Sequence, residues 1–156
     1  MSSPTNWMKK EYDDLVKRGF DWKPPVIGGP STGRAMINDK ERIMLCANNY
    51  LSMSNHPKVK QAAIDAVKSH GAGSGSVRPI AGNMDIHNEL ENTIARFKNR
   101  EAALYYQTGF AVNSGLIPQL AGKNDSIISD QLNHGSIIDG VRLSGVKKEN
   151  RTIYAH

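Results

Sequence analysis

The chain has 156 residues, 38% of them hydrophobic and 22% charged, which is typical of a globular protein with a core of its own. No apolar run approaches the ~20 residues that a membrane span needs, residues 1–10 lack the apolar stretch of a secretory signal, and the single cysteine, Cys46, favours a reducing, cytoplasmic compartment. The formal net charge of +5 comes from scattered lysines and arginines without a nucleic-acid-binding motif, so we expect neither a nucleic-acid nor a membrane partner.

Residues 1–55 are expected to form an N-terminal arm and a strand of a small domain. Residues 6–18 carry apolar side chains at helical spacing, which predicts a short amphipathic helix. Prolines and glycines interrupt residues 24–33, which predicts an extended arm that lies on a later domain or on a partner subunit. The apolar run that follows predicts a short buried strand over residues 42–47.

Residues 56–156 are expected to be the first part of a large domain. The helical periodicity, with Ser54 or Asn55 as the first cap and Asn133 or Ser136 as the last, predicts helices over residues 57–70, 86–97 and 110–120 and a final helix that ends at Leu143. Strands are predicted over residues 102–106, 126–129 and 152–155. This alternation predicts an α/β fold with a mainly parallel sheet, and the small number of strands indicates a piece of a larger domain.

A turn through Thr108, Gly109 and Phe110 follows a predicted strand and begins a predicted helix. Free backbone N–H groups gather at such a turn, and the helix dipole adds partial positive charge, so the turn can bind a phosphate group. An ordinary strand-to-helix turn, with glycine there for steric reasons, explains the same residues. On these residues alone, both interpretations stay open.

His134 follows a predicted strand, and in open α/β sheets ligands lie beyond the carboxyl ends of strands. Its imidazole can stack on a flat heteroaromatic ring or act as an acid or base; alternatively it simply caps the next helix. No histidine or cysteine spacing indicates a metal site, and the glycine-rich residues 71–82 match neither a dinucleotide fingerprint nor a P-loop.

Several segments, in their order along the chain, resemble the α-oxoamine synthases. They are Ala47-Asn48-Asn49-Tyr50-Leu51, His56-Pro57, Ser76-Val77-Arg78, Gly82, His87 with Leu90-Glu91, residues 108–113, and Ser129-Asp130 together with residues 133–143. The similarity runs from about residue 38 to the end. It implies a fold-type I pyridoxal 5'-phosphate (PLP) transferase, a homodimer, and a reaction that joins an amino acid to an acyl-CoA, in most members with loss of carbon dioxide.

The resemblance also implies roles for individual residues. His134 would stack on the pyridine ring of PLP, and Thr108, Gly109 and Phe110 would hold its phosphate. The remaining expected roles concern substrate and partner: Asn48 would help to hold the substrate carboxylate, and the segment with Ser76 and Arg78 would lie near the dimer interface and the partner's site.

Within the family the chain looks most like the glycine C-acetyltransferase branch, which uses glycine and acetyl-CoA. The alternatives are the 8-amino-7-oxononanoate synthase branch, a serine-using acyltransferase and, in another class, a non-catalytic short subunit or dimerisation module. Some residues depart from the family pattern: Ser52 and Gly135 stand where glycine and alanine are usual, Gly109 stands where cysteine is frequent in the closest relatives, and Pro79 follows Ser76-Val77-Arg78. No lysine lies in the family's Thr-x-x-Lys-x-x-Gly context, so this piece alone is expected to be inactive.

Overall fold

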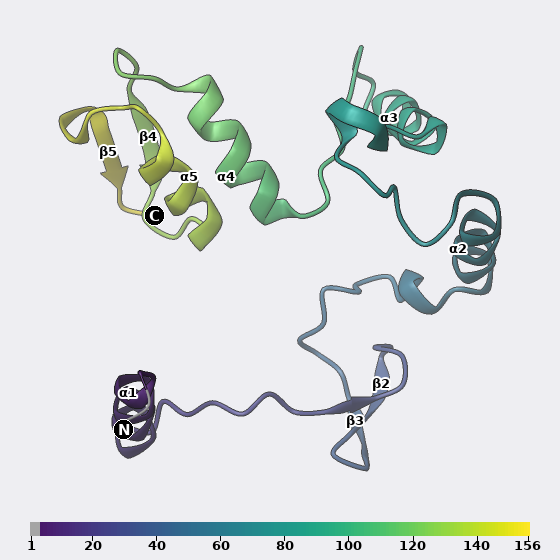
Figure 1. Ribbon diagram of the computed structural model, residues 1–156, viewed down its shortest axis with the longest axis horizontal. Coiled ribbons are helices and arrows are strands. Elements are labelled where there is room, and N and C mark those ends of the chain that lie inside the picture. The colour runs from purple at the N-terminus through teal and green to yellow at the C-terminus, as the bar shows by residue number, and fades with distance from the viewer. Residues whose placement is uncertain (1–3) are drawn as a thin grey trace. The chain divides into compact units, whose positions relative to one another are not determined.

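The computed structural model describes residues 4–156 (Figure 1). The helices are α1 (Asn6–Lys17), α2 (Pro57–His70), α3 (Asp85–Phe97), α4 (Gly109–Leu120) and α5 (Gly135–Leu143). The strands are β1 (Ile27–Gly28), β2 (Arg34–Ile37), β3 (Lys40–Ile43), β4 (Ile127–Asp130) and β5 (Arg151–Tyr154). The residues divide into two compact units, one up to Gly73 and one from Ser74, and each is described by itself. The division of the chain into domains at residue 55 stays a prediction.

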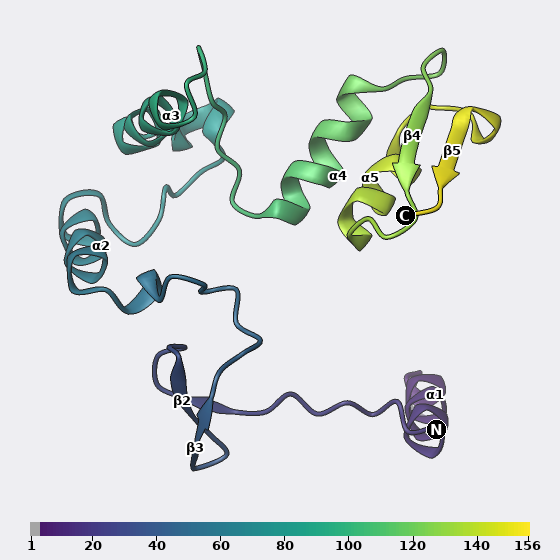
Figure 2. The same cartoon turned by 180° about the vertical axis from the view of Figure 1, so that it is seen from behind.

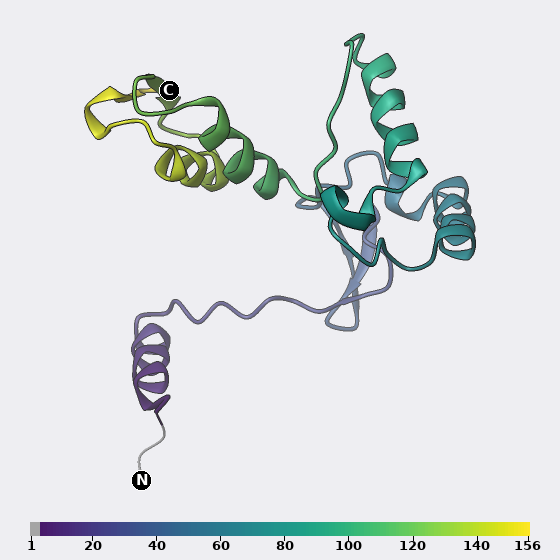
Figure 3. The same cartoon turned by 45° about the horizontal axis from the view of Figure 1, so that its top comes forward.

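The N-terminal unit contains α1, a three-stranded antiparallel sheet and α2. Figure 3 shows α1 joined to the sheet by a segment without helix or strand, and α1 confirms the predicted amphipathic helix. The β2–β3 hairpin was not predicted, although its two-residue turn has a recognisable signal. Asn38 and Asp39 both adopt positive φ, 48° and 60°, as a type I′ hairpin turn requires.

The expectation of a buried strand over residues 42–47 is wrong. The strand ends at Ile43, and every residue of β3 is exposed, with Ile43 itself at 65%. Most of the apolar run lies beyond the strand, and within the described chain β3 is an edge strand that pairs with β2 alone and has no buried residue.

Helix α2 confirms the predicted helix over residues 57–70, with Pro57 in its first turn and Gly71 after its end. Its cap differs from the prediction, because His56, rather than Ser54 or Asn55, occupies the N-cap position. The Nδ1 atom of His56 accepts the N–H of Lys58 at 3.2 Å. No helix within residues 4–156 combines the length and the apolar character that a membrane crossing requires.

The C-terminal unit contains α3, α4, α5 and a two-stranded parallel sheet of β4 and β5. Figures 1 and 2 both show α4 and α5 beside these strands. The helices and both strands confirm their predictions to within a few residues. The strand predicted over residues 102–106 is wrong, because this segment finds no partner strand among residues 4–156 and forms no ladder.

The turn between α5 and β5 holds the most buried side chain of the core, Val146, which is 1% exposed. The guanidinium of Arg151, the first residue of β5, donates to the carbonyl oxygens of Val146, at 2.6 and 3.0 Å, and of Ser144, at 3.3 Å. These bonds fix the start of β5 against the end of α5. Because β4 and β5 are parallel, their carboxyl ends lie at the same edge, and the chain leaves β4 at this edge toward α5.

Ser52 offers a direct test of backbone strain, since it adopts the left-handed conformation at φ 54°, ψ 26°. This geometry costs a non-glycine residue about 1–2 kcal/mol, while the freedom of glycine in the unfolded chain removes about 0.5–1 kcal/mol of the gain. We expect Ser52→Gly to raise the free energy of unfolding of the complete protein by about 0.5–1 kcal/mol in urea denaturation. Ser52→Ala, which keeps the strain, is the control; an equal gain with alanine would contradict the explanation.

Candidate functional site

The predicted phosphate-binding turn forms the N-terminus of α4, a helix of 12 residues. Thr108 is the N-cap: its hydroxyl accepts the N–H of Ala111 at 3.0 Å, and its carbonyl accepts the N–H of Val112 at 3.1 Å. The N–H groups of Gly109 and Phe110 have no acceptor within residues 4–156. Two unpaired donors at the positive end of a helix dipole are a suitable site for a phosphate group.

His134 caps α5 through its ring, so neither Asn133 nor Ser136, the predicted caps, has that position. Its Nδ1 atom accepts the backbone N–H of Ser136 at 3.1 Å and lies 2.7 Å from the Ser136 hydroxyl. A backbone N–H can only donate, so this geometry assigns Nδ1 as an acceptor and the ring proton to Nε2. The orientation of the imidazole is therefore fixed by the helix that it caps.

A hydrogen-bond bridge connects α4 to His134. The side-chain amide of Asn113 donates to the Ser136 hydroxyl at 2.9 Å, and that hydroxyl contacts the imidazole. Ser136 is 3% exposed, so the bridge lies in the interior between the two helices. In such an interior a fully paired polar bridge fixes the relative position of its members.

Gly140 allows α4 and α5 to approach each other closely. A Cβ at this position would overlap the carbonyl oxygen of Asn113 and lie 2.9 Å from Cδ1 of Ile117. Because Asn113 faces Ser136 and Ile117 faces Gly140, the two helices run in the same direction. Their N-termini, which carry Thr108 and His134, therefore lie at the same end of the helix pair.

The carboxyl ends of β4 and β5 meet at Asp130 and His156. The carboxylate of Asp130 accepts from Nδ1 of His156 at 2.8 Å and from the N–H of Leu132 at 2.7 Å. These hydrogen bonds, that of His156 first, lower the pKa of Asp130, and the same carboxylate raises the pKa of the Tyr154 hydroxyl. The contact between His156 and Asp130 joins the chain after β5 to the last residue of β4, where the segment that leads to His134 begins.

Arg78 lies in a π-type turn (Arg78–Gly82) and makes an ion pair with Glu91 of α3. The guanidinium donates to both oxygens of Glu91, at 2.5 and 3.0 Å, and to the side-chain oxygen of Asn83, at 2.7 and 2.9 Å. The hydrogen bond with Glu91 raises the pKa of Arg78, so the guanidinium stays protonated at neutral pH. The predicted substrate role of Arg78 stays a prediction.

The other two predicted substrate residues take different positions. Ser76 is half-buried, and Gly82 lies so close to its carbonyl that any Cβ at Gly82 would overlap the Ser76 backbone. Asn48 belongs to the N-terminal unit and is exposed, with its side-chain oxygen 3.4 Å from the Tyr50 hydroxyl. Its neighbour Asn49 is instead structural, since its amide bonds Ser31 and Ser54 at 2.7 Å each.

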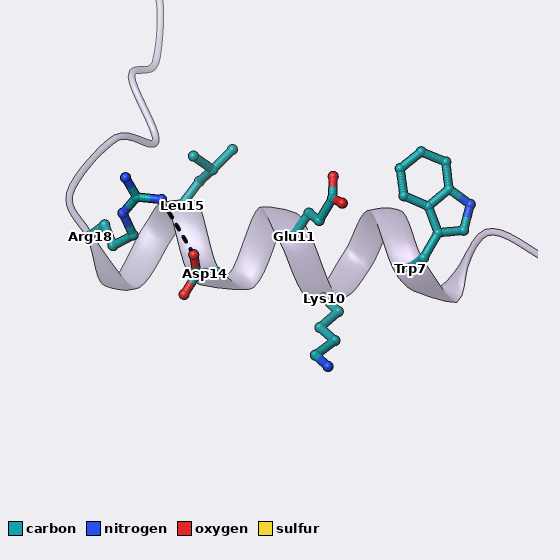
Figure 4. Close-up of a pocket in the computed structure, with 6 residues that line it drawn as sticks. All are labelled: Trp7, Lys10, Glu11, Asp14, Leu15 and Arg18. Atoms are coloured by element: carbon teal, nitrogen blue, oxygen red, sulfur yellow. Dashed lines mark ion pairs between the residues drawn. The ribbon is translucent and has the colours of Figure 1, made fainter.

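A hollow of about 560 Å³ lies along α1 and is separate from the residues predicted to bind ligand. Figure 4 shows its lining side chains spread along a single helix, with Lys10 on the opposite side from Glu11 and an ion pair between Asp14 and Arg18. One exposed helix cannot enclose a ligand as binding pockets do. Within residues 4–156, no group of three or more His, Cys, Asp or Glu side chains is arranged to hold a metal ion.

Sequence reasoning missed the residues that support the site: Asn113, Ser136 as a bridge, Gly140, Glu91 and the Asp130–His156 pair. Gly140 gave a usable signal, because an isolated glycine inside a helical pattern usually marks close packing. The others gave none, since their partners lie 13 to 26 residues away along the chain.

The sequence from residue 40 to residue 154 matches the family model for class I and II aminotransferases. Two curated relatives are 8-amino-7-oxononanoate synthases: that of Alkaliphilus metalliredigens is 48% identical and that of Treponema denticola 47% identical, each over 150 residues. Both matches cover 96% of this chain and 37% of the relative. The chain thus spans little more than a third of the length of these relatives.

Solved structures give a similar result. A serine palmitoyltransferase from Sphingomonas wittichii superposes with a TM-score of 0.82 at 30% identity, over 99% of this chain and 38% of that one. A serine palmitoyltransferase from S. paucimobilis with PLP bound superposes at 0.83 and 28% identity, over 97% of this chain and 38% of that one. An 8-amino-7-oxononanoate synthase from Francisella tularensis superposes at 0.59 and 31% identity, over 71% of this chain and 30% of that one.

The contact at Gly140 predicts a specific sensitivity to added volume. Gly140→Ala places a Cβ against the backbone of Asn113, and overpacking of this kind costs about 1–3 kcal/mol, more than the ~1 kcal/mol that alanine gains in a helix. We expect a lower unfolding midpoint of the complete protein in urea. The matched control in the same helix is Gly135→Ala, where a Cβ meets nothing within 4 Å. Equal effects at both positions would contradict the packing argument.

The ion pair of Glu91 predicts a pH dependence of stability. Hydrogen bonds from Arg78, and then from the backbone of Tyr105, lower the pKa of Glu91 from 4.5 to about 2. A carboxyl with a lowered native pKa stabilises the folded state fully above its unfolded pKa, and this stabilisation is lost as the pH falls through the native value. The stability difference between the wild type and Glu91→Gln should therefore shrink between pH 4.5 and about pH 2, measured by denaturation at each pH. A constant difference would show that the charge is not involved.

Proposed function

Because the chain belongs to the class I and II aminotransferase family, and within it to the α-oxoamine synthases, we propose that it is part of a PLP-dependent enzyme that joins an amino acid to an acyl-CoA. The family match also confirms the fold-type I architecture and PLP as the family's cofactor. The single observation that carries the proposal is the parallel pair α4 and α5, which brings Thr108 and His134 to the same end.

The residues of this end fit PLP. The free N–H groups of Gly109 and Phe110 and the Thr108 hydroxyl provide donors for its phosphate, and α4 adds the field of its N-terminus. When bound, PLP supplies an electron sink for the amino acid carbon that gains the acyl group. The chain's own residues position this group.

His134 provides a flat surface for the cofactor ring. Its hydrogen bonds with Ser136 fix the orientation of the imidazole, with Nδ1 as the acceptor of the Ser136 N–H, so one flat face of the ring is available to the pyridine ring. Ser136 is itself held by Asn113 of α4, so the element that binds the phosphate also orients the ring-stacking group. Both contacts of the cofactor then depend on the same packed helix pair.

For the substrates, the relatives favour the 8-amino-7-oxononanoate synthase reaction over the expected glycine C-acetyltransferase reaction. That product name defines the substrates. The amino group on carbon 8 and the terminal methyl come from alanine after it loses carbon dioxide. The carbonyl at carbon 7 and the remaining chain to the carboxylate come from a seven-carbon dicarboxylic acyl group. We propose this pair of substrates, with CoA and carbon dioxide released.

The whole protein is required for the reaction. The Schiff-base lysine that the family resemblance implies has no counterpart in these residues, so catalysis needs sequence beyond them. We also propose that Asn48 contributes to binding of the substrate carboxylate, as the resemblance implies. A cytoplasmic location suits the single, free and exposed thiol of Cys46.

A homodimer is the proposed assembly. Val77 and Ile80, on either side of Arg78, are 61% and 81% exposed, so within the described chain this segment leaves apolar side chains that a partner could cover. This agrees with the role expected for the segment of Ser76 and Arg78 near a partner subunit.

The experiment that tests the function uses the complete protein with PLP. Alanine and glycine are each combined with acetyl-CoA and with a seven-carbon dicarboxylic acyl-CoA, and release of CoA is measured. We expect the highest kcat/KM with alanine and the dicarboxylic donor; a preference for glycine with acetyl-CoA would restore the first prediction and contradict the present one.

The cofactor site is tested in the same preparation. Bound PLP should give a visible absorbance band that shifts when the amino acid is added, and His134→Ala should weaken PLP binding by about ten-fold, the scale of one lost aromatic stacking contact. Gly135→Ala, next to His134, is the matched control. An unchanged PLP affinity in His134→Ala would remove His134 from the site.

A further inference from the structure

The ion pair of Arg78 and Glu91 is more than a surface contact. The two side chains are 30% and 14% exposed, whereas those of the Arg34–Glu41 pair are 66% and 62% exposed. The Arg78–Glu91 pair is also bidentate, and Asn83 accepts two further hydrogen bonds from the same guanidinium. Charge-assisted bidentate pairs of this kind fix geometry as well as contribute energy.

Glu91 has a second partner, the backbone N–H of Tyr105, which donates to its Oε1 atom at 2.9 Å. The pKa of about 2 keeps the Glu91 carboxylate ionised at neutral pH, so the pair and the backbone bond persist together. One carboxylate thus joins the Arg78 turn, α3 and the segment that precedes α4.

Within the described chain, this hydrogen bond holds the backbone of residues 101–107. Residues 101–107 form no ladder, and within the described chain the Tyr105 N–H is the one backbone group of the segment with a hydrogen-bond partner. Tyr105 precedes Thr108 by three residues. The ring of the next residue, Tyr106, lies beside α4, where a Cβ at Gly115 would meet its Cε1 atom at 4.0 Å. The anchored backbone therefore leads directly into the phosphate turn.

We propose that Arg78 and Glu91 are positioning residues for the phosphate turn: the pair holds the backbone of Tyr105 and, through it, the N–H donors of Gly109 and Phe110. The inference rests on the proposed function and deepens it. It gives Arg78 a task different from the substrate contact that the family resemblance implies. Neither side chain touches the cofactor in this role.

The first test measures the affinity of the complete protein for PLP and for pyridoxal, which lacks the phosphate. The variants are Glu91→Gln, Arg78→Lys and the double variant, and Arg34→Lys, from the exposed pair, is the control. We expect the ratio of PLP to pyridoxal affinity to fall by about ten-fold in Glu91→Gln, the scale of one lost charge-assisted hydrogen bond. The double variant should fall no further than the worse single variant, and Arg34→Lys should match the wild type. A general loss of structure would lower both affinities and leave their ratio unchanged, which would overturn the proposal.

The KM for the amino acid, measured at saturating PLP, separates positioning from direct substrate contact. The proposal expects little change in this KM for Arg78→Lys and Glu91→Gln. A raised KM in Arg78→Lys with an unchanged affinity ratio would assign Arg78 to the substrate and overturn the positioning role.

The second test needs no cofactor, so it separates this inference from the proposed function. Hydrogen exchange of the apo protein should become faster at the Tyr105 amide in Glu91→Gln, because this N–H donates to Glu91, and stay at the wild-type rate in Arg34→Lys. Unchanged exchange in Glu91→Gln would overturn the inference whatever the protein binds. Exchange can be faster in Glu91→Gln while Thr108→Val keeps the wild-type ratio of PLP to pyridoxal affinity. That combination would support the Glu91 anchor but show that the phosphate does not bind at this turn, which contradicts the proposed site.

Discussion

Helices α4 and α5 pack in parallel at a distance that only a residue without a side chain allows. The absence of a Cβ at Gly140 lets the backbone of α5 reach the carbonyl of Asn113, and the same approach brings Asn113 within hydrogen-bond distance of Ser136. From this contact follow the orientation of His134, the direction of α5 and the common position of the two helix N-termini. If the helices moved apart, the unpaired N–H groups and the imidazole would both remain, but they would no longer belong to one site.

The site combines two kinds of preorganisation with different physical origins. The proposed phosphate donors are backbone groups, so they cannot rotate away, but their position depends on the segment that leads into α4. The imidazole is a side chain, and its single orientation comes from the two hydrogen bonds of Nδ1 with Ser136. The structure supports each one separately, through Glu91 and Tyr105 for the turn and through Asn113 and Ser136 for the ring. A binding site built in this way loses little conformational entropy when the ligand arrives.

Local signals predicted the elements well and their surroundings poorly. Periodicity located all five helices, and the turn through Thr108 was recognised because its residues are adjacent in sequence. The strand over residues 102–106 failed because a strand requires a partner, and composition cannot supply one. The predictions of the helix caps were also wrong. Serine and asparagine are the common N-cap residues, whereas His56 and His134 cap their helices through Nδ1. The hydrogen-bond bridges through Glu91 and Ser136 could not be predicted from the sequence, because they join residues far apart along the chain.

The relatives favour the alternative over glycine and acetyl-CoA for a related reason. The residues of this chain that are proposed to bear on chemistry would hold a phosphate and a ring, which are parts of the cofactor and are the same whatever acyl group is transferred. Proteins named for two different reactions, 8-amino-7-oxononanoate synthesis and serine palmitoyl transfer, resemble this same region in sequence or in fold. A region that serves both cannot by itself select the acyl chain. Discrimination between a two-carbon donor and a seven-carbon dicarboxylic donor requires a pocket that measures length and a cation that pairs with the distal carboxylate. Arg78 is not that cation in the described structure, because its guanidinium is already paired with Glu91 and Asn83. For the proposed pair of substrates, the selecting residues are therefore expected outside the α4–α5 pair and its anchor.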